Sequence, residues 1–276
     1  MQGGWLGIFD SGVGGLTVAR AIATALPHAD IAYLGDTARV PYGTRSPETV
    51  RRYAKGCARV LSELGLRALV IACNTASAVA RADLAQEFDG PVLGVIKPGA
   101  RQGAAATRTG HLAVLATATT TASGAYPLAL EEAAPGVRVT SLSCPLLVPL
   151  AEEGWVDGAV PTAVARRYLA PLEGTDVDTL VLGCTHYPLL KGVLRQVGEE
   201  VLGHPLTIVD SAEAVAHELV ARLDAPQAGE AASELGSGRR MFQVTDSLES
   251  FAEVAPRFFG GPVQDVRLVD VVPSGP

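Results

Sequence analysis

The sequence LVIACNT at residues 69–75 and the sequence LVLGCTH at residues 180–186 are two copies of one pattern. Each copy runs through three aliphatic residues and one small residue to a cysteine, which hydrogen-bonding residues then follow. An apolar run that leads into such residues and a helical pattern predicts a strand, a tight turn and a helix N-terminus. We therefore expect both cysteines at the carboxyl ends of strands, where open α/β sheets bind ligands.

The two cysteines, Cys73 and Cys184, are thus predicted to lie in closely related settings. A helix N-terminus favours negative charge and lowers the pKa of a thiol placed there from a free value of about 8.5 towards neutrality. Two matched thiols, each predicted at the start of a helix, are the feature that any function must explain.

The repeat extends beyond the cysteines. Residues 6–26 and residues 112–130 share the order of a buried strand, a polar loop and a helix, with glycines in the first loop and hydroxyls in the second. We interpret this as an internal duplication that makes an α/β fold of two pseudo-symmetric lobes. Each lobe has a mostly parallel sheet flanked by helices, and the active site lies in the cleft between the lobes.

The rest of the chain alternates in the same way. Further strands are predicted at residues 31–34, 91–96, 137–142, 208–209, 242–244 and 266–269, and further helices from residue 46 and at 75–88, 163–172, 188–200, 212–223 and 251–258. Lys97 is expected to begin a connection, and residues 152–154 to form an acidic turn in solvent. The stretch 225–240 is rich in Gly, Ser, Ala and Glu, and we expect a mobile connection there.

Composition restricts the function classes. The chain has 276 residues, of which 48% are hydrophobic, and a formal net charge of -7 without a block of like charges. Nucleic acids and anionic membrane surfaces are therefore not expected as partners, because both attract basic surfaces. No apolar run approaches the roughly 18 residues of a membrane span, and the start of the chain lacks the pattern of a signal peptide.

The four cysteines show neither a CxxC motif nor a paired-histidine spacing, so we expect no metal site and no disulfide framework. Cys57 falls on the apolar face of a predicted helix, and Cys144 lies in an apolar stretch. Both are predicted to be buried structural thiols. These features together predict a soluble, reduced, cytoplasmic protein.

Two loops are candidates for ligand binding. The loop at residues 10–15 carries four glycines or small residues that leave backbone N–H groups free to face a ligand. The less favoured alternative is a tight turn with no ligand. The loop matches neither a dinucleotide nor a Walker phosphate loop, and Asp10 would repel phosphate. An acid beside N–H donors suits a zwitterion. The loop at residues 35–43 is either an ordinary surface loop or a second ligand-facing segment.

The paired thiols indicate a type of reaction. A cysteine nucleophile usually has a histidine base, and His186 lies near Cys184, but no histidine stands in a comparable place near Cys73. A redox pair usually has the CxxC spacing, which is absent. Two thiols on opposite faces of a carbon can instead remove a proton from one face and return one to the other, which inverts a stereocentre.

An amino acid Cα proton is a weak acid, so its removal requires donors that stabilise the carbanion through the carboxylate. Asn74, Thr75 and Thr185, which follow the two cysteines, offer such donors. Asp10 and His186 are neighbouring groups that could tune the thiols.

Four motifs carry a resemblance to a known family: FDSGVGGL at residues 9–16, GDT with PYG at residues 35–43, ACNTA at residues 72–76 and GCTHYP at residues 183–188. In their order and spacing the chain resembles the cofactor-independent glutamate racemases of the aspartate/glutamate racemase superfamily. The likeness runs from about residue 5 to residue 223. Four collinear motifs make it specific.

The resemblance implies that Cys73 and Cys184 are the two acid/base groups and that no cofactor takes part. It implies further catalytic roles for Asp10, His186 and Glu152. The residues that it implies for substrate binding are Asp10, Ser11, Asp36, Tyr42, Gly43, Asn74, Thr75, Thr117, Thr120, Thr185 and His186. The family makes D-glutamate for bacterial peptidoglycan.

The resemblance also implies that the first lobe takes residues 1–97 together with 207–276, and the second lobe residues 98–206. Glutamate is the expected substrate and a homodimer the expected assembly. Three alternatives remain open: a racemase for aspartate, a two-lobed binding protein for a small carboxylic acid, and a thiol hydrolase or disulfide oxidoreductase. The binding protein leaves two matched thiols without a use.

Overall fold

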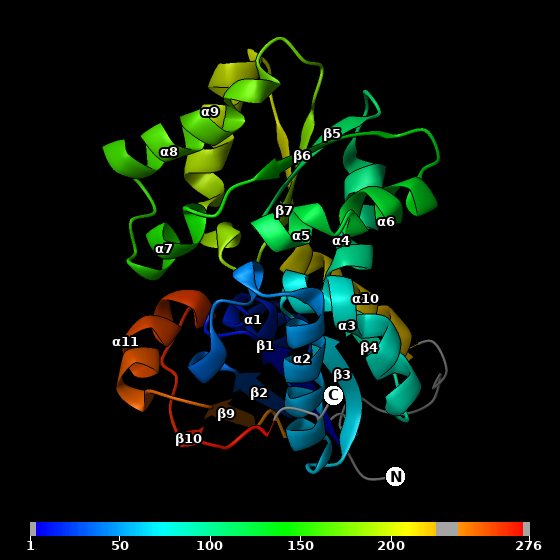
Figure 1. Cartoon of the computed structure of the whole chain (residues 1–276), viewed down its shortest axis with the longest axis vertical. Helices are drawn as coiled ribbons and strands as arrows, with labels where there is room; N and C mark the ends of the chain where they lie inside the picture. Colours follow the sequence, from blue (N-terminus) through cyan, green and yellow to red (C-terminus); the bar gives the residue numbers. More distant parts are fainter. Residues whose placement is uncertain (1–3, 225–236, 273–276) are drawn as a thin grey trace. The chain divides into compact units, whose positions relative to one another are not determined.

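The computed structural model of the chain describes residues 4–224 and 237–272. These residues form two compact units, each with its own parallel sheet (Figure 1). The first unit combines the chain up to Val95 with the chain from Val215 onward, and the second unit is Ile96–Ala214. The part of the expected mobile connection at residues 225–236 lies outside the described residues.

The sheet of the first unit has the strand order β10-β9-β2-β1-β3-β4, and all neighbouring strands are parallel. Its elements are β1 (Trp5–Asp10), α1 (Leu16–Ala25), β2 (Ile31–Gly35), η1 (Thr37–Arg39), η2 (Tyr42–Thr44), α2 (Pro47–Ser62), β3 (Leu66–Ile71), α3 (Asn74–Glu87), β4 (Val92–Gly94), β9 (Arg240–Val244), α11 (Leu248–Phe259) and β10 (Val266–Leu268). Helices α2 and α3 pack together, as do α1 and α11. The two helix pairs cover opposite faces, as right-handed crossovers require.

Local chemistry explains why these elements form where they do. The hydroxyl of Ser46 accepts a hydrogen bond from the backbone N–H of Thr49 at 3.3 Å, and Pro47 follows as the first residue of α2. Both features favour a helix start. Cys57 lies on the inner face of α2 and is fully buried in the core, as expected.

The last strands of the chain complete the first sheet. β9 lies beside β2, with Leu34 opposite Gln243, and β10 lies beside β9, so orange and red strands join blue ones in Figure 1. The buried carboxylate of Asp30 accepts hydrogen bonds from the backbone N–H groups of Ser237 and Arg239 and from the Arg239 guanidinium. Residues 237–240 are therefore ordered by Asp30 and β9, and the prediction of a mobile connection was wrong for them.

The sheet of the second unit has the order β6-β5-β7-β8 and is again parallel throughout. Its elements are α4 (Ile96–Ala106), β5 (His111–Ala116), α5 (Ala118–Ala122), α6 (Ala125–Ala133), β6 (Arg138–Ser143), α7 (Leu147–Glu152), α8 (Ala159–Leu169), η3 (Ala170–Leu172), β7 (Thr179–Gly183), η4 (Tyr187–Leu190), α9 (Lys191–Leu202) and β8 (Thr207–Asp210). Helix α10 (Ser211–Asp224) begins in the second unit and continues into the first.

The two sheets share one strand order. If β5, β6, β7 and β8 are matched with β1, β2, β3 and β4, the second sheet repeats four neighbouring strands of the first. The helices repeat as well, since α8 packs with α9 as α2 does with α3. The prediction of two α/β units with parallel sheets flanked by helices is confirmed.

Two local predictions were wrong. The strand expected at residues 91–96 ends at Gly94, and Ile96 begins the helix α4 where a connection was expected from Lys97. Pro98 is compatible with this helix, because proline is tolerated in the first turn of a helix. The acidic turn expected in solvent at residues 152–154 is present: Glu152 is the exposed last residue of α7, and residues 153–154 form the turn. Glu152 also pairs with a histidine described below.

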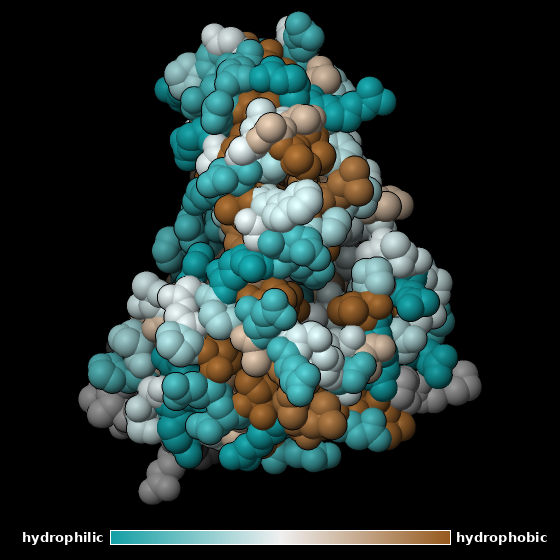
Figure 2. All heavy atoms as spheres, turned by 90° about the vertical axis from the view of Figure 1, so that its left-hand side faces the viewer, coloured by the Kyte–Doolittle hydropathy of each residue, from teal (hydrophilic) through white to brown (hydrophobic). Residues whose placement is uncertain are grey.

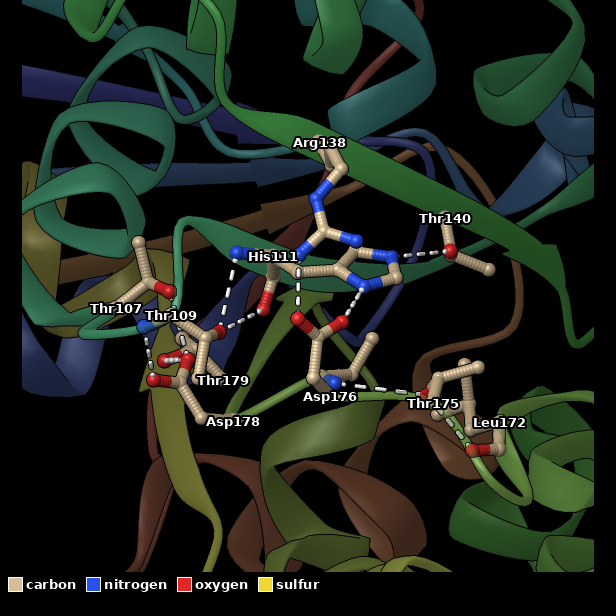
Figure 3. A network of polar contacts seen from close by, with 11 residues as sticks. Thr107, Thr109, His111, Arg138, Thr140, Leu172, Thr175, Asp176, Asp178 and Thr179 are labelled. Carbon is tan, nitrogen blue, oxygen red and sulfur yellow. Dashed lines mark hydrogen bonds and ion pairs between the residues drawn. The ribbon is translucent and has the colours of Figure 1, made fainter.

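A polar network holds the amino edge of the second sheet (Figure 3). Asp178, just before β7, accepts hydrogen bonds from the Thr107 hydroxyl at 2.7 Å and from the backbone N–H groups of Arg108 and Thr109 at 2.7 and 2.9 Å. His111, the first residue of β5, contacts Asp176 through Nδ1 at 2.7 Å. The network ties the start of β5 to the start of β7, at the edge opposite the cysteine.

The surface is mixed in character. Figure 2 shows apolar side chains interrupted by hydrophilic ones on the side of the second unit that carries α7 and α8. Leu146, Trp155 and Val160, around α7 and α8, are the large apolar side chains of this region that remain exposed. Within residues 4–224 and 237–272, no helix is both long enough and apolar enough to cross a membrane.

Candidate active site

The two cysteines occupy corresponding places in the two sheets. Cys73 follows β3 and Cys184 follows β7, and each of these strands lies beside the first strand of its sheet. The strand order reverses between that first strand and the strand carrying the cysteine. In open α/β sheets this switch point, at the carboxyl ends of the strands, is where ligands bind.

In the first unit, Cys73 caps the helix that it precedes. Its Sγ accepts a hydrogen bond from the backbone N–H of Ala76 at 3.4 Å, and only 6% of the residue is exposed. Asn74 and Thr75, the first residues of α3, are buried beside it. The sulfur therefore faces backbone donors and the positive end of the helix dipole.

Asp10 stands at the end of β1, next to the cysteine strand. Its carboxylate is fully buried and accepts a hydrogen bond from the Gly12 backbone N–H at 3.0 Å. A Cβ atom on Gly15 would lie 2.4 Å from the Cβ of Asp10 and 3.0 Å from the Cβ of Ala72. Glycine at position 15 is thus needed for α1 to start directly against Asp10 and the end of β3.

The side chain of Tyr33 supports the loop that follows Asp10. Its hydroxyl donates to the Gly12 carbonyl at 2.6 Å, and its ring stacks on Phe251 of α11, with the ring centroids 6.4 Å apart. Burial, and then the nearby Asp10 carboxylate and Cys73 sulfur, raise the pKa of Tyr33 well above its ordinary range. Tyr33 therefore stays protonated and remains a hydrogen-bond donor.

The loop after β2 is organised by Asp36. This carboxylate is fully buried and accepts hydrogen bonds from Arg39 Nη1 at 2.6 Å, from the Tyr42 hydroxyl at 2.6 Å and from the Thr245 hydroxyl at 2.9 Å. Burial, followed by Cys57 and Asp36, raises the pKa of Tyr42 well above its ordinary range. Both oxygens of Asp36 are thus engaged by side chains of the protein itself, and Gly43 follows the tyrosine that it holds.

In the second unit, Cys184 is joined to a histidine and a glutamate. Its Sγ lies 3.8 Å from Nδ1 of His186, and Nε2 of His186 lies 2.9 Å from Oε1 of Glu152. The Thr185 hydroxyl also lies 3.3 Å from the same Nδ1. Cys184, Thr185 and His186 are all buried, whereas the Glu152 carboxylate is partly exposed at the end of α7.

Opposing effects set the charge of this histidine. Burial disfavours the imidazolium, but the hydrogen bonds to Cys184 and Glu152, with the attraction of both groups, outweigh burial and raise the pKa of His186 to about 10. These contacts therefore favour the charged imidazolium over the neutral ring. In its charged form His186 places a positive charge beside the Cys184 sulfur.

Thr117 and Thr120 lie at the neighbouring strand end. Ala116 pairs with Gly183 across β5 and β7, which places Thr117 beside Cys184 in the register. The two threonine hydroxyls lie 3.1 Å apart, and Thr120 is buried in the short helix α5. The structure therefore brings the hydroxyls of Thr117 and Thr120 together at the carboxyl edge of this sheet.

Comparison with known proteins agrees with this arrangement. The family model for Asp/Glu/hydantoin racemases matches residues 16–219. A curated glutamate racemase from Geobacter metallireducens is 49% identical over 266 residues, which cover 96% of each chain. The chain belongs to the glutamate racemase family. The resemblance in the sequence motifs is thereby confirmed, and the chain is an enzyme of the isomerase class.

Solved glutamate racemases share the fold. A crystal structure of a glutamate racemase from Bacillus anthracis is 38% identical, has a TM-score of 0.89 and matches over 98% of this chain and 99% of its own. The glutamate racemase from Francisella tularensis, solved in complex with D-glutamate, is 32% identical with a TM-score of 0.86, over 98% and 99% of the two chains.

In this racemase-family chain Cys144 directly follows β6, and Cys57 lies within α2. Cys144 is fully buried, and burial, with a smaller contribution from Cys184, raises its pKa to about 12. Burial also raises the pKa of Cys57 far above its ordinary value. Both are structural thiols, as predicted, because a thiol that stays protonated is a poor base.

No group of three or more His, Cys, Asp or Glu side chains suited to a metal ion occurs among the residues that the structure describes. Sequence reasoning about this racemase-family chain missed Tyr33, Arg39 and Thr245. Tyr33 carried a usable signal, because a tyrosine in an otherwise apolar strand needs a partner for its hydroxyl. Thr245 carried none, since it lies 209 residues from Asp36 in the sequence.

Proposed function

We propose that this protein interconverts L-glutamate and D-glutamate without a cofactor and that Cys73 and Cys184 are its two acid/base groups. One observation carries the proposal: the two cysteines follow corresponding strands in two sheets of the same order. A duplicated binding edge with a thiol in each copy suits a reaction that needs a proton acceptor and a proton donor on opposite faces of one carbon.

The proposed reaction conserves protons. One cysteine, as thiolate, takes the Cα proton from one face of the amino acid and becomes a thiol. The other cysteine, as thiol, gives a proton to the opposite face and becomes a thiolate, which leaves the inverted enantiomer. By family resemblance, Cys73 removes the proton from D-glutamate and Cys184 removes it from L-glutamate.

In the first half of the proposed site, Asp10 and Ser11 face the ammonium side of the substrate. The backbone of Tyr42 and Gly43, with Asn74 and Thr75 at the start of α3, supplies donors to a carboxylate. Support comes from the burial of Asp10, Tyr42, Asn74 and Thr75 and from the N-terminus of α3, which attracts anions.

In the second half, His186 and Glu152 hold Cys184 ready for proton transfer, and Thr117, Thr120 and Thr185 bind substrate oxygens. The raised pKa of His186 supports this assignment, because a positive group beside the sulfur stabilises a thiolate. The donors also stabilise the carbanion that forms when the Cα proton leaves.

The biological role follows from the product. We propose that the enzyme supplies D-glutamate for peptidoglycan, acts in the cytoplasm and works as a homodimer. We also propose that the two units act as two lobes, each contributing one thiol to a shared substrate.

The test is proton exchange in deuterium oxide. The purified protein is incubated with D-glutamate, with no added cofactor or metal, and Cα deuteration and optical rotation are followed. We expect deuterium uptake together with loss of rotation, and no loss of rotation in Cys73→Ser or Cys184→Ser. Exchange of aspartate but not of glutamate would replace the substrate and keep the mechanism. No exchange of either amino acid would refute the two-thiol reaction and favour a binding protein.

A further inference from the structure

The loop between β2 and α2 is fastened to the C-terminal part of the chain. The Thr37 hydroxyl donates to the Asp246 carbonyl at 2.7 Å and accepts from the Asp246 backbone N–H at 2.8 Å. The Thr245 backbone N–H donates to the Gly35 carbonyl at 3.2 Å. The residues that follow β9 therefore run beside the start of this loop and extend the pairing of β9 with β2.

Thr245 does more than extend the sheet. Its hydroxyl accepts a hydrogen bond from the backbone N–H of Ala38 at 2.9 Å and donates one to Oδ1 of Asp36 at 2.9 Å. The other carboxylate oxygen of Asp36, Oδ2, accepts the hydroxyl of Tyr42 at 2.6 Å. A continuous chain of hydrogen bonds thus runs from Thr245 through Asp36 to Tyr42.

Arg39 reinforces the same carboxylate. Its guanidinium contacts Oδ1 of Asp36, donates to the carbonyl of Val271 and lies over the ring of Tyr53, with 5.6 Å between Cζ and the ring centroid. Asp36 is fully buried, and a buried charge is tolerated only where donors surround it. Loss of one donor would leave the Asp36 carboxylate less firmly held.

The Tyr42 ring is what this chain of bonds fixes. The ring is buried against Tyr53, with 5.6 Å between the ring centroids, and its hydroxyl is held by Asp36. Because both ends of the side chain are then restrained, the backbone of Tyr42 and Gly43 has one position. Fixed donors are worth more to a bound anion than donors that must be ordered on binding.

We propose that Thr245, with Arg39, is a positioning residue for the racemase. Through Asp36 and Tyr42 it holds the backbone donors of Tyr42 and Gly43 where a substrate carboxylate binds. Asp36 on this view contacts protein groups and acts on the substrate only through Tyr42. The inference rests on the proposed function, because it requires glutamate to bind at Tyr42 and Gly43.

The test compares Thr245→Val, which removes the hydroxyl at nearly constant shape, with Thr245→Ser, which keeps it. Thr245→Val should raise KM for both glutamate enantiomers about tenfold, the loss expected for one hydrogen bond to a charged group. Its kcat should change less than KM. Thr245→Ser should restore KM to within about twofold of the wild type.

Asp30→Asn is the matched control. Asp30 is also a buried carboxylate that fastens the C-terminal part of the chain to the first sheet, but it stands at the start of β2, at the opposite edge. This variant should lower Tm without raising KM. An equal rise of KM in Asp30→Asn and Thr245→Val would show a purely structural effect and overturn the proposal.

A double-mutant cycle tests the route through Tyr42. Tyr42→Phe removes the hydroxyl that Asp36 holds, so adding Thr245→Val to it should raise KM little further. If the two substitutions instead multiplied each other's effects on KM, the proposed route from Thr245 through Tyr42 would be overturned. If Thr245→Val does not fold, Arg39→Gln takes its place, since Arg39 bonds the same oxygen of Asp36. Wild-type protein that fails to racemise glutamate would refute the proposed function, whereas an active wild type with unchanged KM in these variants would refute the positioning role alone.

Discussion

Cys73 and Cys184 stand at corresponding ends of two matching sheets, yet the charged groups around them differ in sign and in origin. In the first unit the acid Asp10 ends β1, and the corresponding residue of β5 is Ala116. In the second unit His186 stands two residues after the cysteine, where the first unit has Thr75. One thiol thus has a carboxylate on the neighbouring strand, and the other has an imidazolium from its own loop.

The comparison separates the placement of each sulfur from the control of the charge around it. The repeated strand order places each sulfur at a strand end, which the backbone alone achieves. The side chains that set the charge near each sulfur come from different positions of the repeat, so the copies have diverged in chemistry without a change in topology. The two thiols should therefore respond differently to the loss of their neighbours and to pH.

The largest expected effect comes from the thiols themselves. Cys73→Ser and Cys184→Ser should each lower kcat for racemisation by about 10²–10⁴, the usual contribution of a positioned acid or base. Circular dichroism of glutamate measures the rate. Cys144→Ala is the control and should keep nearly full activity, because Cys144 is a buried structural thiol. Full activity in either serine variant would show that the replaced thiol is not one of the two acid/base groups.

Removal of the neighbouring charge should produce an asymmetric defect. Asp10→Asn and His186→Asn should each lower kcat/KM by about 10- to 100-fold, since each removes hydrogen bonds to a charged group. The enantiomers have equal free energy, so kcat/KM must fall equally in both directions. The thiol that each variant affects can be identified instead from the primary isotope effect, which compares the rates with Cα-protonated and Cα-deuterated glutamate.

We expect His186→Asn to raise that isotope effect with L-glutamate and Asp10→Asn to raise it with D-glutamate, because each variant slows proton transfer at its own thiol. The same isotope effects for both enantiomers in both variants would mean that the two charged groups serve the two thiols alike.

The charge on His186 should also appear in stability. Its pKa is raised in the folded state to about 10, above the unfolded value of about 6.5. The stabilisation is therefore fully present below about pH 6.5 and is lost as the pH rises towards 10. Tm measured across this range should fall more in the wild type than in His186→Gln. Each kcal/mol of unfolding free energy that is lost should lower Tm by about 2–4 °C. Parallel curves for the two proteins would contradict the raised pKa.

The smallest effect on activity is expected at the opposite edge of the second sheet. Asp178→Asn weakens the network of Figure 3, in which Asp178 accepts hydrogen bonds from Thr107, Arg108 and Thr109. It should cost about 1–3 kcal/mol of unfolding free energy. Both kcat and KM should stay within about twofold of the wild type, because the chemistry belongs to the carboxyl edge. A large change in kcat would mean that the two edges are coupled.

Much of this fold was predictable from local pattern. The runs before Cys73 and Cys184 are aliphatic throughout, which is typical of strands buried on both faces of a parallel sheet. Ser46 and Pro47 mark the start of α2 by capping chemistry that needs only three or four residues. The repeat of strand, loop and helix then indicated two units.

The partners within the site were less predictable. His186 stands two residues from Cys184, so their pairing could be anticipated, but its contact with Glu152 spans 34 residues. The contacts of Asp36 were not predictable, because a single sequence does not reveal that Thr245, 209 residues later, donates a hydrogen bond to it. Helix α4 was not predicted, although its Pro98 falls in the first turn, where proline is compatible with a helix.

The return of β9 to the side of β2 has a consequence for synthesis on the ribosome. The second unit is one continuous segment, Ile96–Ala214, whereas the first unit is divided by it. Domains commonly fold as they emerge, N-terminal parts first. Here the earliest strands must wait for β9, and Asp36 waits for Thr245. A nascent chain therefore completes the setting of Cys184 before that of the loop near Cys73, and a chain that stops before residue 245 lacks the group that holds this loop.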